Sequence, residues 1–277
     1  MAELDAIANA TGREGWDCHA HLFGPYDRHP LAGQRSYTPP EATQRAYLAV
    51  LESLGLGRGV LVHPSAYGTD YSLVLETLAT QPRWRGVLVT ADAAPATLRA
   101  WRAAGIRGLR FSHRSAGNFA GSASLADLQR LAPAMADTGI HAELWTDNQA
   151  LPELAPVLRT LPVTVVLDHM AGFEHTAGPD APGFRVLLDL VHKHPVWVKL
   201  CAYRSLRDAP DPEVGKAFQQ ALVAANPDQL VWGSDWPHLN LQPVPATRDL
   251  MDDFLRWTGD AAVARRILVD NPQRLYA

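Results

Sequence analysis

Apolar runs and amphipathic segments alternate along the whole chain. Eight short runs rich in β-branched and other apolar residues predict strands, at Trp16–Leu22, Gly59–His63, Gly86–Thr90, Ile106–Phe111, His141–Thr146, Val163–Asp168, Val196–Leu200 and Leu230–Gly233. Segments with helical periodicity lie between or after them, at Ala42–Leu54, Ser72–Ala79, Ala96–Ala103, Leu125–Asp137, Leu151–Leu158, Phe184–His192, Glu213–Ala225 and Thr247–Trp257. Repeated strand–helix units with short connections predict a parallel sheet, and eight of them predict an α/β fold closed into a (β/α)8 TIM barrel. We expect one such domain over residues 1–277.

In a (β/α)8 barrel the chemistry takes place at the carboxyl ends of the strands. Polar residues stand at most of these ends: His19 and His21 at the first, His63 and Ser65 at the second, Arg110 with His113 and Arg114 at the fourth, Asp168 and His169 at the sixth, Tyr203 and Arg204 after the seventh, Asp235 and His238 at the eighth. Buried polar groups are costly without partners. Convergence of His19, His21, His169 and Asp235 on one mouth therefore predicts a functional site.

The first predicted strand carries two histidines two residues apart. Strand alternation places His19 and His21 on one face, with Cys18 and Ala20 on the other. Such a pair can hold a metal, polarise a substrate or pack in the core, and the pattern alone leaves these alternatives open. Asp17 is assigned no role.

Other histidines are expected to be structural or exposed. His141 begins the fifth predicted strand, at the opposite end of the barrel, and is expected to be structural. The histidines in predicted loops or on a helix are expected to be exposed to solvent: His29, His175, His192 and His194.

Composition excludes several classes of protein. A net charge of −4 without a basic run argues against a nucleic-acid surface. The two cysteines, Cys18 and Cys201, fall in apolar strand-like runs, which argues against a disulfide scaffold. No segment resembles a signal peptide or a membrane span. We expect a soluble, cytoplasmic protein, and composition does not determine its oligomeric state.

Five segments carry a family resemblance, in the order DCHAHLFGP, LDHMAG, VWVKLCAYR, VWGSDWPH and ILVDNPQRLY. Together they resemble the amidohydrolase superfamily, and within it the branch of 2-pyrone-4,6-dicarboxylate lactonases and sugar-lactone hydrolases. The resemblance extends over essentially the full chain. It implies a hydrolase whose partner is a small-molecule lactone with carboxylate or hydroxyl substituents.

The resemblance also implies residue roles. Asp235 corresponds to the general base that activates water, and His19, His21 and His169 to the groups that polarise the lactone carbonyl. The implied substrate-binding residues are Tyr37, Ser65, Arg110, Arg114, Arg204 and His238. The chemistry agrees, because ester hydrolysis needs a base near a water and donors for the developing oxyanion. Arginine also suits a substrate carboxylate, which its planar fork binds with two hydrogen bonds.

The chain departs from the pyrone lactonases at one position. Three residues after the strand-six histidine those enzymes have an arginine, and this chain has Gly172. His175 and Arg185 are candidate substitutes for the missing carboxylate ligand. The departure favours a related lactone with a different acidic or hydroxylated substituent.

The sequence also bears on metal use. Superfamily members with two metals use a carboxylated lysine at the end of strand four, and this chain has no lysine between Met1 and Lys193. One-metal members add a histidine from strand five, where this chain has Leu144-Trp145-Thr146. A single divalent ion such as zinc on His19, His21 and Asp235 stays an alternative, since three protein ligands and a water suffice. We expect catalysis without a cofactor, because three histidines and nearby arginines can stabilise an oxyanion.

Two further functions stay open beside lactone hydrolysis. The same site would also serve a lactone isomerase, decarboxylase or hydratase of the superfamily. A barrel that binds a metabolite without turning it over is the alternative from another class.

Overall fold

The computed structural model describes residues 12–118 and 121–277, and its strands form one parallel barrel. The strands are β1 (Trp16–Ala20), β2 (Arg58–Val62), β3 (Arg85–Val89), β4 (Ile106–Ser112), β5 (His141–Trp145), β6 (Val165–Leu167), β7 (Val196–Leu200) and β8 (Leu230–Trp232). Each pairs in parallel with the next along the chain. A bridge between Ala20 and Trp236, in the segment that follows β8, brings the end of the chain of strands back to β1. The predicted (β/α)8 barrel is therefore confirmed.

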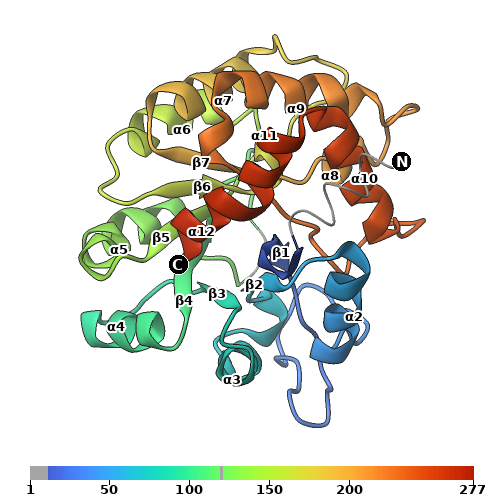
Figure 1. The fold of residues 1–277 in the computed structure, drawn as a ribbon. Helices are drawn as coiled ribbons and strands as arrows, with labels where there is room; N and C mark the ends of the chain where they lie inside the picture. The colour runs from blue at the N-terminus through green and yellow to red at the C-terminus, as the bar shows by residue number, and fades with distance from the viewer. Residues whose placement is uncertain (1–11, 119–120) are drawn as a thin grey trace.

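Helices surround the strands in a ring (Figure 1). They are α2 (Gln44–Leu54), α3 (Ser72–Thr80), α4 (Pro95–Ala103), α5 (Leu125–Thr138), α6 (Leu151–Leu158), α7 (Pro182–Lys193), α8 (Tyr203–Leu206), α9 (Val214–Ala225), α10 (Thr247–Thr258), α11 (Ala261–Arg265) and α12 (Asn271–Tyr276). The sequence pattern did not predict α8, α11 or α12, which are short. Within the described ranges, no helix combines the length and apolar character that crossing a bilayer requires.

The C-terminal helix α12 closes the amino end of the barrel. Its Tyr276 is buried in a small cluster with side chains of β1, β2, β3 and β8. Arg85 and Arg107, at the starts of β3 and β4, both donate from Nε to the Tyr276 carbonyl over 3.0 Å. His141 packs edge-on against the same tyrosine, with ring centroids 5.2 Å apart, which fits the structural role expected for it. Ligand access is therefore left to the carboxyl end of the strands.

A bulge in β1 changes the expected alternation. The pairing register with β2 shifts between Asp17 and Ala20, and such an extra residue redirects the side chains around it. Cys18 packs in the small cluster with Trp16, whereas Ala20 packs in the main core between strands and helices. The prediction that Cys18 and Ala20 share a face is therefore wrong. His19 and His21 do meet, with ring centroids 5.0 Å apart.

Gly233 allows β8 to approach β1 closely. A Cβ at this position would lie 2.7 Å from the His19 Cβ and 3.0 Å from the His19 main-chain nitrogen. Because backbone atoms have little freedom to move, we expect Gly233→Ala to lower the free energy of unfolding by about 1–3 kcal/mol, as overpacking commonly does. Urea unfolding measures this change.

Gly33→Ala is the matched control, since no atom lies within 4 Å of a Cβ built there. Equal stability of the two variants would show that β1 can yield to the added methyl group.

Candidate active site

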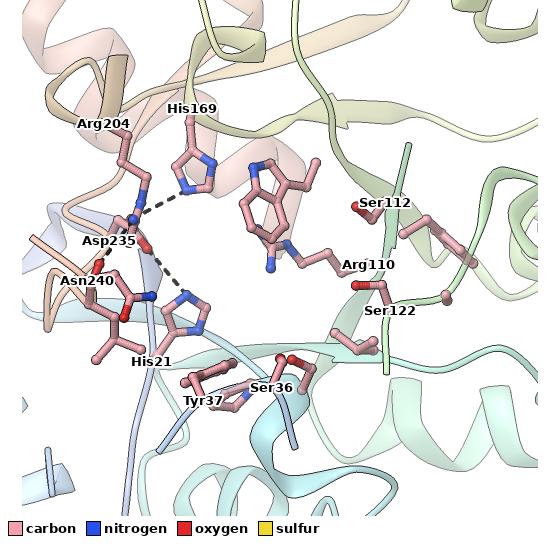
Figure 2. A pocket seen from close by; sticks show the side chains of 17 residues that line it. His21, Ser36, Tyr37, Arg110, Ser112, Ser122, His169, Arg204, Asp235 and Asn240 are labelled. Carbon is pink, nitrogen blue, oxygen red and sulfur yellow. Dashed lines mark hydrogen bonds and ion pairs between the residues drawn. The ribbon is translucent and has the colours of Figure 1, made fainter. Parts of the chain in front are cut away.

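A cavity of about 230 Å³ opens at the carboxyl end of the strands. Most of the predicted site residues line it: His21, Tyr37, Ser65, Arg110, His169, Arg204 and Asp235. Figure 2 shows two sides, one with Asp235, His21, His169, Arg204 and Asn240, the other with Arg110, Ser112 and Ser122. The site thus has a side bearing a carboxylate and imidazoles and a side bearing a guanidinium and hydroxyl groups.

The other predicted site residues lie outside the lining. His19 is fully buried next to His21, and their Nε2 atoms are 3.3 Å apart. Arg114 stacks over the Trp145 ring at 4.8 Å. His238 contacts the Thr247 hydroxyl through Nε2 at 2.9 Å and packs edge-on against Tyr203. These three residues are placed to support the groups that face the cavity.

The two oxygens of Asp235 have different surroundings. Oδ2 accepts hydrogen bonds from the Tyr203 hydroxyl at 2.8 Å and from Arg204 Nε. Oδ1 makes no hydrogen bond, although His21 Nε2 lies 3.3 Å away and His19 Nε2 3.6 Å away. Burial favours the neutral acid, but Arg204 and then His169 outweigh it and hold the pKa of Asp235 well below its usual range. The carboxylate is therefore ionised, with one oxygen still able to accept.

His169 follows β6 in an unusual backbone conformation. Its φ is +49°, and Asp235 has a φ of +55°; non-glycine residues adopt this left-handed region rarely and at a cost in energy. Both ring nitrogens of His169 are buried without a hydrogen bond, and Nε2 lies 3.5 Å from Asp235 Oδ2. Burial lowers the pKa of His169, which favours the neutral ring. The His169 ring therefore lines the cavity with neither nitrogen hydrogen-bonded to a described residue.

Behind His19 lies a buried charge cluster that sequence analysis missed. The Lys199 side chain is fully buried, and its Nζ lies 2.5 Å from Glu143 Oε2, 3.3 Å from Asp168 Oδ1 and 3.1 Å from His19 Nδ1. Burial favours the neutral amine, but Glu143 and Asp168 outweigh it and raise the pKa of Lys199. Burial, followed by the Lys199 charge, lowers the pKa of His19 to about 3. The cluster therefore holds an ammonium beside a neutral imidazole.

Asp168 links this cluster to the far side of the cavity. Its Oδ2 accepts a hydrogen bond from Arg110 Nε at 2.7 Å. The Arg110 and Arg114 guanidinium groups stack over the Trp145 ring, at 5.0 Å and 4.8 Å from its centroid. Trp145 and Asp168 together fix Arg110 where it lines the cavity.

Asp17, which is assigned no role in the sequence analysis, joins β1 to the segment that follows β8. Its carboxylate accepts from the Ser234 main-chain nitrogen at 2.8 Å, the Ser234 hydroxyl at 2.6 Å, the Tyr47 hydroxyl at 3.0 Å and the His19 main-chain nitrogen at 3.2 Å. Burial raises the pKa of Asp17 to about 6. These hydrogen bonds hold the main chain at His19 and at Ser234, the residue before Asp235.

Several peripheral expectations need correction. The candidate substitutes for the missing arginine do not line the cavity: the Arg185 side chain is 70% exposed and pairs with Asp180, and His175 is half-buried elsewhere. Gly172 has a φ of +52°, and a Cβ there would lie 3.2 Å from the Thr146 carbonyl oxygen, so a longer side chain is disfavoured. His29 is buried against Ser72 instead of exposed, because the long loop before α2 folds back onto α3.

Residues able to hold a metal ion are present among those described. They form two groups, His19 with His169 and Asp235, and His19 with Glu143 and Asp168. The Lys199 ammonium already fills the second group. In the predicted set of His19, His21 and Asp235, the two imidazole Nε2 atoms hydrogen-bond to each other. An ion in this predicted set would have to replace the hydrogen bond between the two Nε2 atoms.

The amidohydrolase family model matches residues 16–277. The chain belongs to the amidohydrolase family. It is 32% identical to a 4-sulfomuconolactone hydrolase of Hydrogenophaga intermedia, over 94% of this chain and 88% of that protein. It is also 32% identical to a 2-pyrone-4,6-dicarboxylate hydrolase of Comamonas testosteroni, over 94% and 89%. The family predicted from the sequence motifs is confirmed.

Two further relatives bear on the range of this family. A D-galactarolactone isomerase of Agrobacterium fabrum is 27% identical, over 96% of this amidohydrolase and 92% of the isomerase. A crystal structure from Acinetobacter baumannii, described as a probable 2-pyrone-4,6-dicarboxylic acid hydrolase with citric acid bound, superposes with a TM-score of 0.82. It shares 26% identity, over 95% of this chain and 99% of that one.

Proposed function

We propose that this amidohydrolase opens a small lactone that carries an acidic or hydroxylated substituent. The observation that carries the proposal is the buried, ionised Asp235, which lines the same cavity as His169 and Arg110 and has one oxygen without a hydrogen bond to the described residues. The lactone hydrolases among its relatives support the substrate class.

In the proposed mechanism, Asp235 Oδ1 takes a proton from a water molecule as its oxygen attacks the lactone carbonyl carbon. Tyr203 and Arg204 hold Oδ2, so the carboxylate keeps its orientation during the transfer. The carbonyl oxygen becomes negative, and His169 is placed to donate a hydrogen bond to it.

Collapse of the tetrahedral intermediate breaks the bond between the acyl carbon and the ring oxygen. The ring oxygen leaves and receives the proton that Asp235 took from water. The product is an open hydroxy acid, or its keto form where the leaving oxygen is an enol. Its new carboxyl group ionises at neutral pH and releases one proton per turnover.

A panel of lactones in weakly buffered pH indicator tests the proposal directly. We expect acidification with at least one carboxylated or polyhydroxylated lactone. Binding of such lactones without acidification or any other conversion would favour the metabolite-binding barrel instead.

Lactone isomerisation is the second candidate, because one relative is a galactarolactone isomerase. In that reaction a hydroxyl group of the substrate replaces water as the nucleophile. Proton NMR of the product separates the two reactions, since hydrolysis gives an open acid and isomerisation gives a shifted ring.

Substrate recognition gives a prediction for the arginines. We expect Arg110→Met to lower kcat/KM for a carboxylated substrate. The loss should correspond to about 1.5–3 kcal/mol of transition-state stabilisation, the value of a charge-assisted hydrogen bond. Arg110→Lys should recover little, because the forked geometry is lost. Arg204→Met should also reduce kcat/KM, because it removes a hydrogen bond that orients Asp235, and Arg114→Met should do so by removing the guanidinium that stacks beside Arg110 on Trp145.

Arg185→Met is the control for these variants, since its side chain is exposed and outside the cavity. If all three site replacements match this control, the substrate carboxylate binds elsewhere.

The pH dependence follows from the direction of the pKa shifts. Arg204 keeps Asp235 ionised well below its usual pKa, and burial lowers the pKa of His238 to about 4. Asp235 accepts a proton only when ionised, and neither Asp235 nor His238 takes up a proton above about pH 5, so kcat/KM should stay flat from about pH 8 down to about pH 5. An acid limb with a pKa near 6.5, the ordinary histidine value, would instead identify an imidazole as the base.

We further propose that the reaction needs no metal ion and takes place in the cytoplasm. The hydrogen bond between the His19 and His21 rings supports the first point. Cys18 and Cys201 are both free thiols, which agrees with a reducing compartment.

A further inference from the structure

Lys199 contacts the one nitrogen of His19 that points away from Asp235. Its Nζ lies 3.1 Å from His19 Nδ1, in hydrogen-bonding geometry. Glu143 and Asp168 flank the same ammonium at 2.5 Å and 3.3 Å, which keeps it protonated. An ammonium group can only donate, so His19 Nδ1 must accept and its ring proton must be on Nε2.

At the other end of the same chain of hydrogen bonds, the Val62 carbonyl determines which ring nitrogen of His21 carries the proton. His21 Nδ1 lies 2.7 Å from the Val62 carbonyl oxygen, which can only accept. The His21 proton is therefore on Nδ1, and in the neutral ring Nε2 is an acceptor. His19 Nε2 lies 3.3 Å from this acceptor and donates to it. Asp235 Oδ1 is the other acceptor near these nitrogens, 3.6 Å from His19 Nε2, but it makes no hydrogen bond with the described residues. Along the chain from Lys199 through His19 and His21 to Val62, each donor is then matched with an acceptor.

Asp168 is the competitor for His19 Nδ1. Its Oδ1 lies 3.3 Å from that nitrogen, and a bond between them would place the His19 proton on Nδ1. Oδ1 nevertheless makes no hydrogen bond in this structure. The geometry thus favours the lysine as the partner of Nδ1.

We propose that Lys199 is a positioning residue that holds the His19 proton on Nε2 and so prevents this histidine from binding a metal. An imidazole coordinates a metal through an unprotonated nitrogen, and here Lys199 uses the lone pair of Nδ1 while Nε2 carries the proton. This inference rests on the proposed function, because it assumes that His19 belongs to the site where the lactone reacts. Its test needs no substrate, so the two proposals fail separately.

The tautomer of His19 is measured by ¹⁵N NMR of protein labelled in histidine, with the His19 signals assigned by their loss in His19→Gln. We expect a protonated Nε2 and an unprotonated Nδ1 in the unaltered enzyme. A protonated Nδ1 would overturn the proposal, whether or not any variant folds.

A charge-balanced variant tests the consequence. Lys199→Met with Glu143→Gln removes one buried positive and one buried negative charge, and leaves Asp168 as the nearest partner of His19 Nδ1. We expect the proton to move to Nδ1 and zinc to bind about ten- to a hundredfold more tightly than to the unaltered enzyme, the usual scale for a changed partner of a metal-ligating histidine.

The control is Lys193→Met with Asp189→Asn, which removes a surface pair whose atoms lie 2.5 Å apart. It should change neither the tautomer nor zinc affinity, measured by equilibrium dialysis with elemental analysis. Adding His19→Gln to the Lys199/Glu143 variant should abolish the increase in zinc affinity. Equal zinc affinity with and without Lys199 in folded proteins would overturn the proposal.

Discussion

Replacing Asp235 with asparagine is expected to lower kcat at least about a hundredfold, the range for loss of a general base. The amide has nearly the same shape as the carboxylate and still accepts from the Tyr203 hydroxyl at one oxygen. It cannot take a proton from water. The loss should therefore appear in the turnover rate on any lactone the enzyme opens, with the protein still folded by circular dichroism.

Asp208→Asn is the control for this variant. The Asp208 side chain is 76% exposed and pairs with its neighbour Arg207, so turnover should be unchanged. A folded Asp235→Asn enzyme with near-normal kcat would show that another group activates the water.

The barrel was predictable because its signals are local. Each strand–helix unit shows its own periodicity, as in the run Val196–Leu200, and the order of units alone implies the architecture. The same logic predicted that His21, His169 and Asp235 lie together, since the fold gathers the strand ends, and all three line one cavity.

The buried partners of these residues depend on contacts between distant strands. Glu143 and Lys199 are far apart in sequence, and only the closed barrel brings their charges within 2.5 Å. The sequence nevertheless carried a signal for these two residues. Glu143 and Lys199 each place a charged side chain within an apolar strand, and a buried charge must find a partner on folding. The bulge at Cys18 and the left-handed backbone of His169 had no comparable signal, because both arise from how neighbouring strands meet.

Asp168 is the residue on which most of this buried network depends. It contacts Lys199, His19 and Arg110, and its own side chain is fully buried. Asp168→Asn leaves Glu143 as the carboxylate beside Lys199 and removes the ion-pair partner of Arg110, so one positive charge is then uncompensated inside the barrel. Breaking a buried pair in this way typically costs about 3–5 kcal/mol, so we expect urea unfolding to show a loss of that size.

A double variant separates lost charge balance from lost packing. Adding Lys199→Met to Asp168→Asn removes the uncompensated ammonium, so the pair should be less destabilised than the sum of the two single variants by at least about 1 kcal/mol. Asp189→Asn, which breaks exposed pairs with Arg159 and Lys193, should leave the free energy of unfolding nearly unchanged. If Asp168→Asn is no worse than this surface change, or if the single effects simply add, then the ammonium reaches water in the folded protein and Asp168 does not balance its charge.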